Sequence, residues 1–312
     1  MKLETLLFTG AAVLSTARLL APPKTLAARQ NFNLNFNGEA ETCAELRVSS
    51  NNGEVAKIAE SFTMTRAEAP LLELNGIDRA HIRVRGWDRA DYVVETCKVA
   101  VAETRAEAEQ MARSVSISRS AGRISHNGPI VNDNGQWSVV YLIRAPKDVT
   151  VDLETSNGPL SVREMNGTVK VRASNGPIAI TDCGGNVDAR TINGPIAFNG
   201  DHGEVHLNAQ NGPIAVRFES ESWNGSQLEA RTINGPLAIS IPDNFRTGMR
   251  LETAGNAPLS CNADLCRNAF TNLTLQNRTL QMNGASDTIR LSTENGPVAI
   301  NANRKDSKAR YF

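Results

Sequence analysis

The chain has 312 residues, and its 33 Lys and Arg residues balance 33 Asp and Glu residues, so the formal net charge is zero. A balanced charge offers no basic footprint for nucleic acid or for an anionic membrane surface. Aromatic residues make up only 5% of the chain, too few for a platform that stacks bases or sugars. Nucleic acid is therefore not an expected partner.

The first segment, 1–28, has the composition of a secretory signal peptide. Lys2 precedes an apolar run over 6–14, and the small residues Ala27 and Ala28 suit a signal-peptidase cut. The run is too short to span a bilayer, so no transmembrane span is expected in the mature chain. We predict an extracytoplasmic protein, in the periplasm, at the outer membrane or on the cell surface. The alternative is an ordinary N-terminal helix.

The five cysteines would then lie in an oxidising compartment, where disulfides are plausible. Cys261 and Cys266 are close enough in sequence to close a small loop, and a Cys43–Cys97 bond would pin the N-terminal region; Cys183 is left over. Connectivity stays open at this point. Metal binding is the weaker reading, because no Cys-x-x-Cys motif or histidine cluster is present.

Residues 29–146 alternate apolar and polar positions in several short runs, which predicts a small strand-rich α+β module. The predicted strands are 44–50, 81–88, 91–102, 114–120 and 137–146.

One amphipathic helix is expected within this module, at about 104–115. Thr104 followed by Glu107 forms a capping-box sequence. The apolar positions that follow have helical spacing and are Ala108, Met111, Ala112 and Val115. We expect the module to cap one end of the repeats that follow.

From residue 147 to 301 the tripeptide Asn-Gly-Pro recurs before a short apolar alternation. The Asn-Gly pairs are Asn157-Gly158, Asn175-Gly176, Asn193-Gly194, Asn211-Gly212, Asn234-Gly235 and Asn295-Gly296. The first four are spaced by 18 residues, too few for a βαβ crossover. The period predicts a parallel β-solenoid of two-strand coils, with a degenerate coil at 261–283 and a basic tail at 302–312.

The tripeptide is interpreted as a structural turn. Asn and Gly enter left-handed turn conformations at low cost, and Pro fixes φ at the start of a strand. Stacked Asn side chains can also hydrogen-bond from coil to coil, as in other Asn ladders. The repeated Asn-Gly pairs are therefore expected to form a turn ladder that sets the register of the coils.

Two surface columns and one tryptophan are candidates for a partner-binding face. Arg172, Arg190 and Arg231 share one outward column, which suits an anionic glycan or an ordinary solvated surface. Trp223 lies in a five-residue insertion, either as an exposed contact or as a cover for the side of the repeats. A column of small residues, able to receive a partner or simply to allow tight sheet geometry, comprises Ser161, Ala179, Ala197, Ala215, Ala238 and Ala299.

The chain lacks the motifs of the common catalytic and nucleotide-binding sites. It has no Gly-x-Ser-x-Gly, P-loop or His-Glu-x-x-His sequence. No catalytic residue, cofactor or metal ion is therefore expected.

Three features together resemble a bacterial "putative adhesin" β-strand-repeat family, an envelope domain of unknown function. They are "HIRVRGWDRADYVV" followed by "TRAEAEQMA", then "WSVVYLIRAPKDVTVDLETSNGPLSV", and the Asn-Gly repeats. The resemblance covers about 46–301. It implies an extracytoplasmic β-solenoid without an established set of catalytic residues.

The leading hypothesis is an exported, non-enzymatic module of the cell envelope that acts in adhesion, scaffolding or sensing, with an envelope protein or glycan as partner. One alternative is a carbohydrate-active β-helix protein that acts on an anionic polysaccharide through Arg172, Arg190 and Arg231. Another is a structural polymer that self-associates through the exposed ends of the solenoid.

Overall fold

The computed structural model describes residues 34–37, 40–131, 135–254, 257–273, 277–283 and 288–303. The expected signal peptide, 1–28, lies outside the described residues, as does 304–312 of the expected tail. The described residues form one compact unit.

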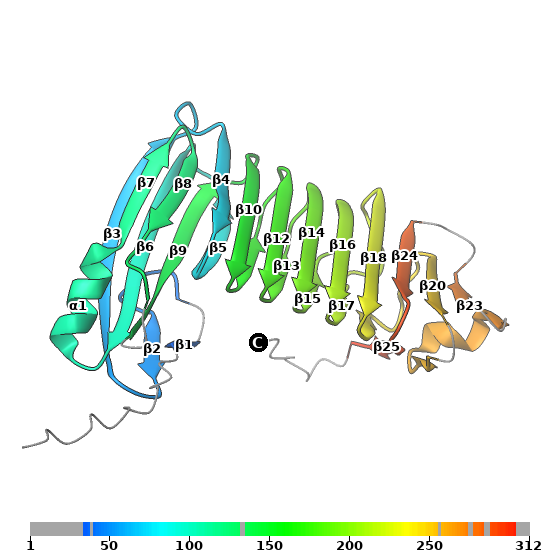
Figure 1. Cartoon of the computed structure of the whole chain (residues 1–312). Coiled ribbons are helices and arrows are strands. Elements are labelled where there is room, and N and C mark those ends of the chain that lie inside the picture. The colour runs from blue at the N-terminus through cyan, green and yellow to red at the C-terminus, as the bar shows by residue number, and fades with distance from the viewer. Residues whose placement is uncertain are drawn as a thin grey trace, which may run out of the picture. The chain divides into compact units, whose positions relative to one another are not determined.

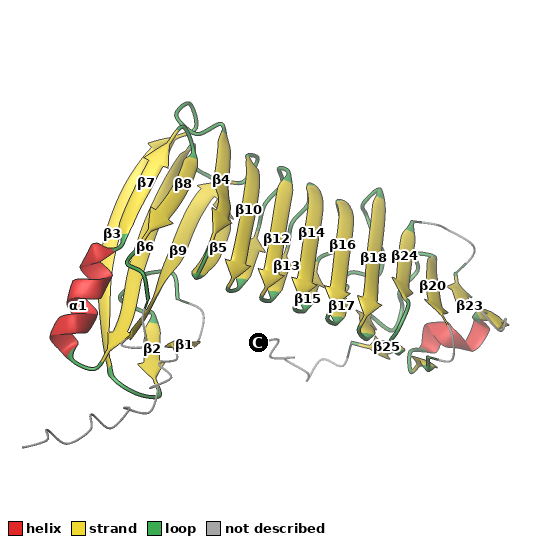
Figure 2. Ribbon diagram, in the orientation of Figure 1, coloured by secondary structure: helices red, strands yellow, loops and turns green. Residues whose placement is uncertain are grey.

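The fold is all-β, as expected, and is built from two large mixed sheets that remain open (Figure 2). Sheet 1 has 12 strands in the order β22-β23-β20-β24-β18-β16-β14-β12-β10-β4-β8-β7. Sheet 2 has 11 strands in the order β21-β25-β19-β17-β15-β13-β11-β5-β9-β6-β3. The two remaining strands, β1 (Leu34–Asn37) and β2 (Arg47–Ser50), form a separate antiparallel pair.

Each repeat contributes one strand to each large sheet. In sheet 1 these are β10 (Thr150–Asn157), β12 (Val169–Asn175), β14 (Asn186–Asn193), β16 (Glu204–Asn211), β18 (Gln227–Asn234), β20 (Met249–Ala254) and β24 (Ile289–Thr293). In sheet 2 they are β11 (Leu160–Arg163), β13 (Ile178–Thr181), β15 (Ile196–Asn199), β17 (Ile214–Arg217), β19 (Leu237–Ile241), β21 (Leu259–Cys261) and β25 (Val298–Ala302). From β10 to β18 the strands lie side by side in chain order (Figure 1).

The core lies between the two sheets, because alternate residues of every repeat strand face inward. In one repeat Val169 and Val171 of β12 are buried in the same cluster as Ile178 and Ile180 of β13. Equivalent residues pair in register from repeat to repeat, as Val169 does with Val187. The inward residues are mainly Val, Ile and Leu, which suit a pleated sheet with one buried face, and this is why the alternation specifies the register.

The strands between 54 and 146 join the same two sheets. β4 (Leu71–Ile77) pairs with β10, and β5 (Ala80–Trp87) pairs with β11, both in parallel. The sheets thus continue across the expected boundary at 146/147. The other strands here are β3 (Glu54–Thr65), β6 (Asp91–Ala102), β7 (Ser116–Ser120), β8 (Arg123–Asn127) and β9 (Gly135–Pro146). β3, β4 and β8 were not among the strands predicted from the sequence.

The one α-helix of the described chain, α1 (Arg105–Ser114), lies where the sequence predicts it. Thr104 accepts from the backbone N–H of Glu107, and the Glu107 carboxylate accepts from the backbone N–H of Thr104 at 3.0 Å. The helix packs on β3 and β6 of sheet 2, with Ala112 and Val115 in the main core.

The C-terminal end departs from the predicted order of coils. β24 lies between β18 and β20, and β25 lies between β19 and β21, so the last repeat in sequence is inserted before the preceding one (Figure 1). The prediction of a degenerate coil at 261–283 is wrong. A 3₁₀ helix, η1 (Asp264–Asn268), leads to β22 (Phe270–Leu273) and β23 (Asn277–Met282), and β23 pairs antiparallel with β20.

Candidate functional site

The Asn-Gly pairs of the repeats do form a ladder of side-chain amides. The Asn175 amide donates to the Asn157 side-chain oxygen at 3.2 Å, and the same bond links every successive pair up to Asn295 and Asn234 at 2.9 Å. The intermediate donors are Asn193, Asn211 and Asn234. The first rung, Asn157, donates to the Asp78 carboxylate at 2.7 Å. The turn ladder thus joins six repeats to the β4–β5 turn.

The reason expected for glycine in these turns is wrong at most positions. Of the six ladder glycines only Gly158 has a left-handed φ, of 132°. The others are required by close approach: a Cβ on Gly194 would lie 2.2 Å from the Gly176 carbonyl oxygen, and one on Gly212 would lie 2.0 Å from that of Gly194. The glycines therefore allow the backbones of successive turns to touch.

The arginine column lies on the outward side of sheet 1, and carboxylates neutralise it. Arg172 forms ion pairs with Asp152 at 2.7 Å and with Glu154 at 3.1 Å. Arg190 donates to both carboxylate oxygens of Asp188 at 2.8 and 2.9 Å.

The third arginine of the column, Arg231, pairs with Glu294 at 2.5 Å. It also lines a hollow of about 290 Å³ beside Arg250, Glu252 and Ser292. This hollow carries both signs of charge, so the column does not present a basic stripe.

Trp223 is not an exposed contact, which makes that prediction wrong. Its side chain is buried, with its ring centroid 5.8 Å from that of Phe218 and 6.2 Å from that of Phe198. The ring belongs to the core at the side of the repeats, where Phe245 stacks on Phe218. It cannot contribute to a binding face.

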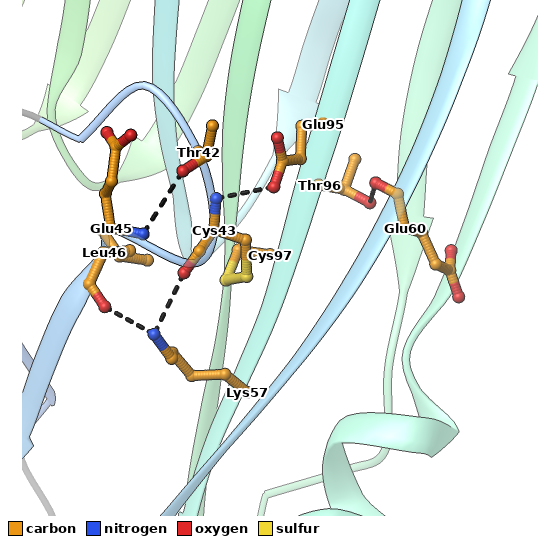
Figure 3. The surroundings of a disulfide bond; sticks show 9 residues. All are labelled: Thr42, Cys43, Glu45, Leu46, Lys57, Glu60, Glu95, Thr96 and Cys97. Atoms are coloured by element: carbon orange, nitrogen blue, oxygen red, sulfur yellow. Dashed lines mark hydrogen bonds between the residues drawn. A yellow bond between two sulfur atoms is a disulfide. The ribbon is translucent and has the colours of Figure 1, made fainter.

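The structure joins Cys43 to Cys97 and Cys261 to Cys266 by disulfides, with Cα atoms 5.4 and 6.1 Å apart. Cys183 is a free, buried thiol, and burial raises its pKa to about 11. The Cys43–Cys97 bond holds residues 40–46 against the outward side of sheet 2 (Figure 3).

Further bonds fix this 40–46 segment. The Lys57 ammonium donates to the carbonyl oxygens of Cys43 at 3.0 Å and Leu46 at 2.7 Å, and the Glu95 carboxylate accepts from the Cys43 N–H at 2.7 Å (Figure 3). Beneath it Val99 and Val140 complete a separate small hydrophobic cluster. The 40–46 segment is therefore held in place on the outward side of sheet 2.

Beside the 40–46 segment, prolines and small residues cover the outward side of the repeat strands in sheet 2. The parity of each strand places a proline and a small residue outward, while their neighbours point into the core. The proline row is Pro159, Pro177, Pro195, Pro213, Pro236 and Pro297, and the small-residue row is Ser161, Ala179, Ala197, Ala215, Ala238 and Ala299. We call these two rows the floor.

A pocket of about 330 Å³ opens where the floor meets the 40–46 segment. Its outward lining residues come from the 40–46 segment and from β9, β5, β11, β13 and β15. Four arginines stand around its edge, and we call them the arginine wall: Arg83, Arg85, Arg144 and Arg163. The sequence predicts the row of small residues but not this hollow, because the 40–46 segment that borders the pocket lies more than a hundred residues before that row in the chain.

The arginine wall already holds one carboxylate of the protein. Glu41 accepts from Arg144 at 3.0 Å and also pairs with Arg85, whose other nitrogen pairs with Glu164 at 3.0 Å. The hydrogen bond from Arg144, with Arg85 beside it, holds the pKa of Glu41 below its ordinary value. Arg83 donates to the Ala40 carbonyl oxygen at 3.1 Å and so helps to hold the 40–46 segment in place.

His81 is a neutral member of the lining. Burial, together with the charge of Arg83, lowers its pKa to about 4. At neutral pH the pocket thus combines apolar surface, guanidinium groups and an uncharged imidazole.

Among the described residues no group of three or more His, Cys, Asp or Glu side chains is placed to hold a metal ion. Within the same residues, no helix has the length and apolar character needed to cross a membrane.

Comparisons with known proteins give fold-level likenesses only. No family model and no curated protein matches the chain. It is similar to the crystal structure of a "putative adhesin" from Parabacteroides distasonis, with 11% identity, a TM-score of 0.37, and coverage of 79% of this chain and 97% of that one. For a "putative adhesin" from Bacteroides fragilis the values are 11%, 0.35, 80% and 98%. A "putative cell adhesion protein" from Clostridium sporogenes gives 10%, 0.32, 79% and 99%, so proteins of the kind that the sequence resemblance names are among the similar solved structures.

Proposed function

We propose that this protein is an exported, non-enzymatic β-solenoid of the bacterial envelope that binds an envelope component, as an adhesin-like or scaffold module. The in-register parallel pairing of equivalent residues and the turn ladder support the solenoid. Strands that pair on both sides and touch through glycine form a rigid surface, which loses little conformational entropy when it binds a partner.

The observation that carries the proposal is the pocket at the start of the floor. Small-molecule and peptide sites are concave, mostly apolar and marked by a few polar groups. The pocket has this character, and it adjoins the proline and small-residue rows. We assign the binding face to this side of sheet 2.

The polysaccharide-processing alternative receives less support. Its arginines are each paired with a carboxylate of the same face, so an anionic glycan would have to displace Asp188 from Arg190 and Asp152 from Arg172. The binding role therefore remains the preferred function.

The experiment is capture of partners from a bacterial envelope extract on immobilised protein. Ala197→Arg places a long charged side chain on the floor inside the pocket, whereas Ala299→Arg makes the same change in the same row far from it. We expect A197R to lose the captured component and A299R to retain it. Equal capture by both variants, or no capture by the unchanged protein, would refute this binding face.

A further inference from the structure

The pocket on sheet 2 has two chemically different parts. Its floor consists of Pro159, Pro177, Ser161, Ala179 and Ala197. Its edge is the arginine wall, with guanidinium groups from β5, β9 and β11. A ligand that matches both parts has an apolar body and an anionic group at one end.

The floor offers almost no hydrogen-bonding partners. Each strand beneath it is paired on both sides, so its backbone N–H and C=O groups are used within the sheet; Pro177, for example, accepts from Leu160 at 2.9 Å. Apart from the Ser161 hydroxyl, the floor presents proline rings and methyl groups.

A peptide or sugar chain lying on this floor would bury polar groups without partners, which is unfavourable. A hydrocarbon chain has no such groups and gains from burial in proportion to its length. The floor therefore favours an acyl chain over a peptide or a glycan.

The charge of the lining selects an anion. The four arginines, together with the two glutamates that pair with them, Glu41 and Glu164, carry a formal charge of +2, since His81 is neutral at pH 7. Glu41 shows which group these arginines take, because its carboxylate lies between Arg85 and Arg144. Guanidinium groups form their strongest hydrogen bonds with carboxylate and phosphate oxygens.

We propose that the pocket binds the monomeric anion of a single-chain fatty acid, with the carboxylate at Arg163 and Arg83 and the chain along the floor. This ligand class rests on the proposed binding function of the same face. From β11 to β17 the floor covers three strand spacings, about 14 Å, enough for roughly ten carbon atoms in extended form. A pocket of about 330 Å³ suits a single molecule rather than a bilayer surface.

Calorimetric titration of the full, disulfide-bonded protein tests the ligand class. The probes are hexanoate, octanoate and decanoate below their micelle concentrations, decanamide as a neutral chain, and acetate and inorganic phosphate as anions without a chain. Since the floor covers one side of the chain only, affinity should rise about fourfold for every two methylene groups, half the increment for full burial. Decanamide should bind at least about tenfold more weakly, and acetate and phosphate should show no binding.

Variants separate the two parts of the pocket. A197R should abolish decanoate binding, and A299R should leave it unchanged. Arg163→Gln should weaken decanoate about tenfold without affecting decanamide, and Arg163→Lys should restore most of the loss because it retains the charge.

Three results would overturn the proposal: affinity that does not depend on chain length, equal decanoate binding by A197R and A299R, or binding to anionic phospholipid vesicles without binding of monomeric decanoate. If the envelope capture is sensitive to A197R while decanoate does not bind, the ligand class fails and the binding face stands. If decanoate binds in the expected pattern while the capture is insensitive to A197R, the proposed envelope role fails instead.

Discussion

Replacing Gly194 with Ala tests whether the ladder glycines are required by packing rather than by backbone conformation. The φ angle of Gly194 lies outside the left-handed region, so alanine has no conformational penalty there. Its Cβ, however, would lie 2.2 Å from the Gly176 carbonyl oxygen, and the two turns must separate by about 1 Å to restore an ordinary contact.

That separation breaks the hydrogen bonds between the two turns. They are the bond from Gly176 N–H to the Asn193 carbonyl oxygen at 3.1 Å, the one from Ile178 N–H to the Pro195 carbonyl oxygen at 2.9 Å, and the side-chain bond from Asn193 to Asn175 at 2.9 Å. At about 1 kcal/mol each, three lost bonds lower the free energy of unfolding by about 3 kcal/mol.

The matched control is Gly76→Ala. Gly76 has a left-handed φ of 65°, but a Cβ built on it meets nothing within 4 Å. Alanine there carries only the conformational cost, about 1–2 kcal/mol. Urea unfolding followed by circular dichroism, with unchanged m-values, gives both differences. If G194A is no more destabilised than G76A, the packing explanation of the ladder glycines is refuted.

Four further changes have defined outcomes. Asn193→Ala removes two exposed hydrogen bonds of the turn ladder and should lower the free energy of unfolding in urea by about 1–2 kcal/mol. An equal decrease for the same substitution at a solvent-exposed asparagine outside the ladder would count against a stabilising role of the ladder. Replacing Cys43 and Cys97 by Ser should lower stability by about 2–4 kcal/mol, and unchanged proteolysis of the 40–46 segment would contradict its fixation by the disulfide. Because the pKa of His81 is about 4 in the folded chain, the unfolded chain binds a proton first as the pH falls, so the free energy of unfolding should decrease between pH 6.5 and 4. In urea unfolding, His81→Gln should flatten the dependence of the midpoint on pH in this range, and an unaltered slope would show that other groups cause it. Trp223→Ala should cost about 3–5 kcal/mol while leaving ligand binding at the pocket intact, whereas loss of binding at full stability would return this residue to the binding face.

The repeat strands could be predicted from the sequence because two periods coincide in it. The alternation that buries Val169 and Val171 has period two, and the Asn-Gly turns recur every 18 residues from Asn157, so strand type, sheet face and register all follow. The helix could be placed as well, since the capping box at Thr104 and Glu107 is a local interaction.

The remaining features depend on contacts between distant residues. The order of strands at the C-terminal end could not be predicted, because β20 and β24 have the same alternation and either could follow β18. The polar sequence around Trp223 concealed a ring that fills the space beside Phe198 and Phe218. The pocket itself needs the 40–46 segment to be held by a bond to Cys97, 54 residues from Cys43.

Because β24 lies between β18 and β20, the order of strands in the sheet differs here from their order along the chain. Each earlier repeat strand of sheet 1, from β10 to β18, pairs with the equivalent strand of an adjacent repeat, so those pairs close short loops. β18 pairs with β24, and Leu228 and Ile289 of that pair are 61 positions apart in the sequence. The edge of β18 therefore reaches its native partner only once the chain is available through β24. Assembly of this end is a late, long-range closure rather than one more step of growth by addition.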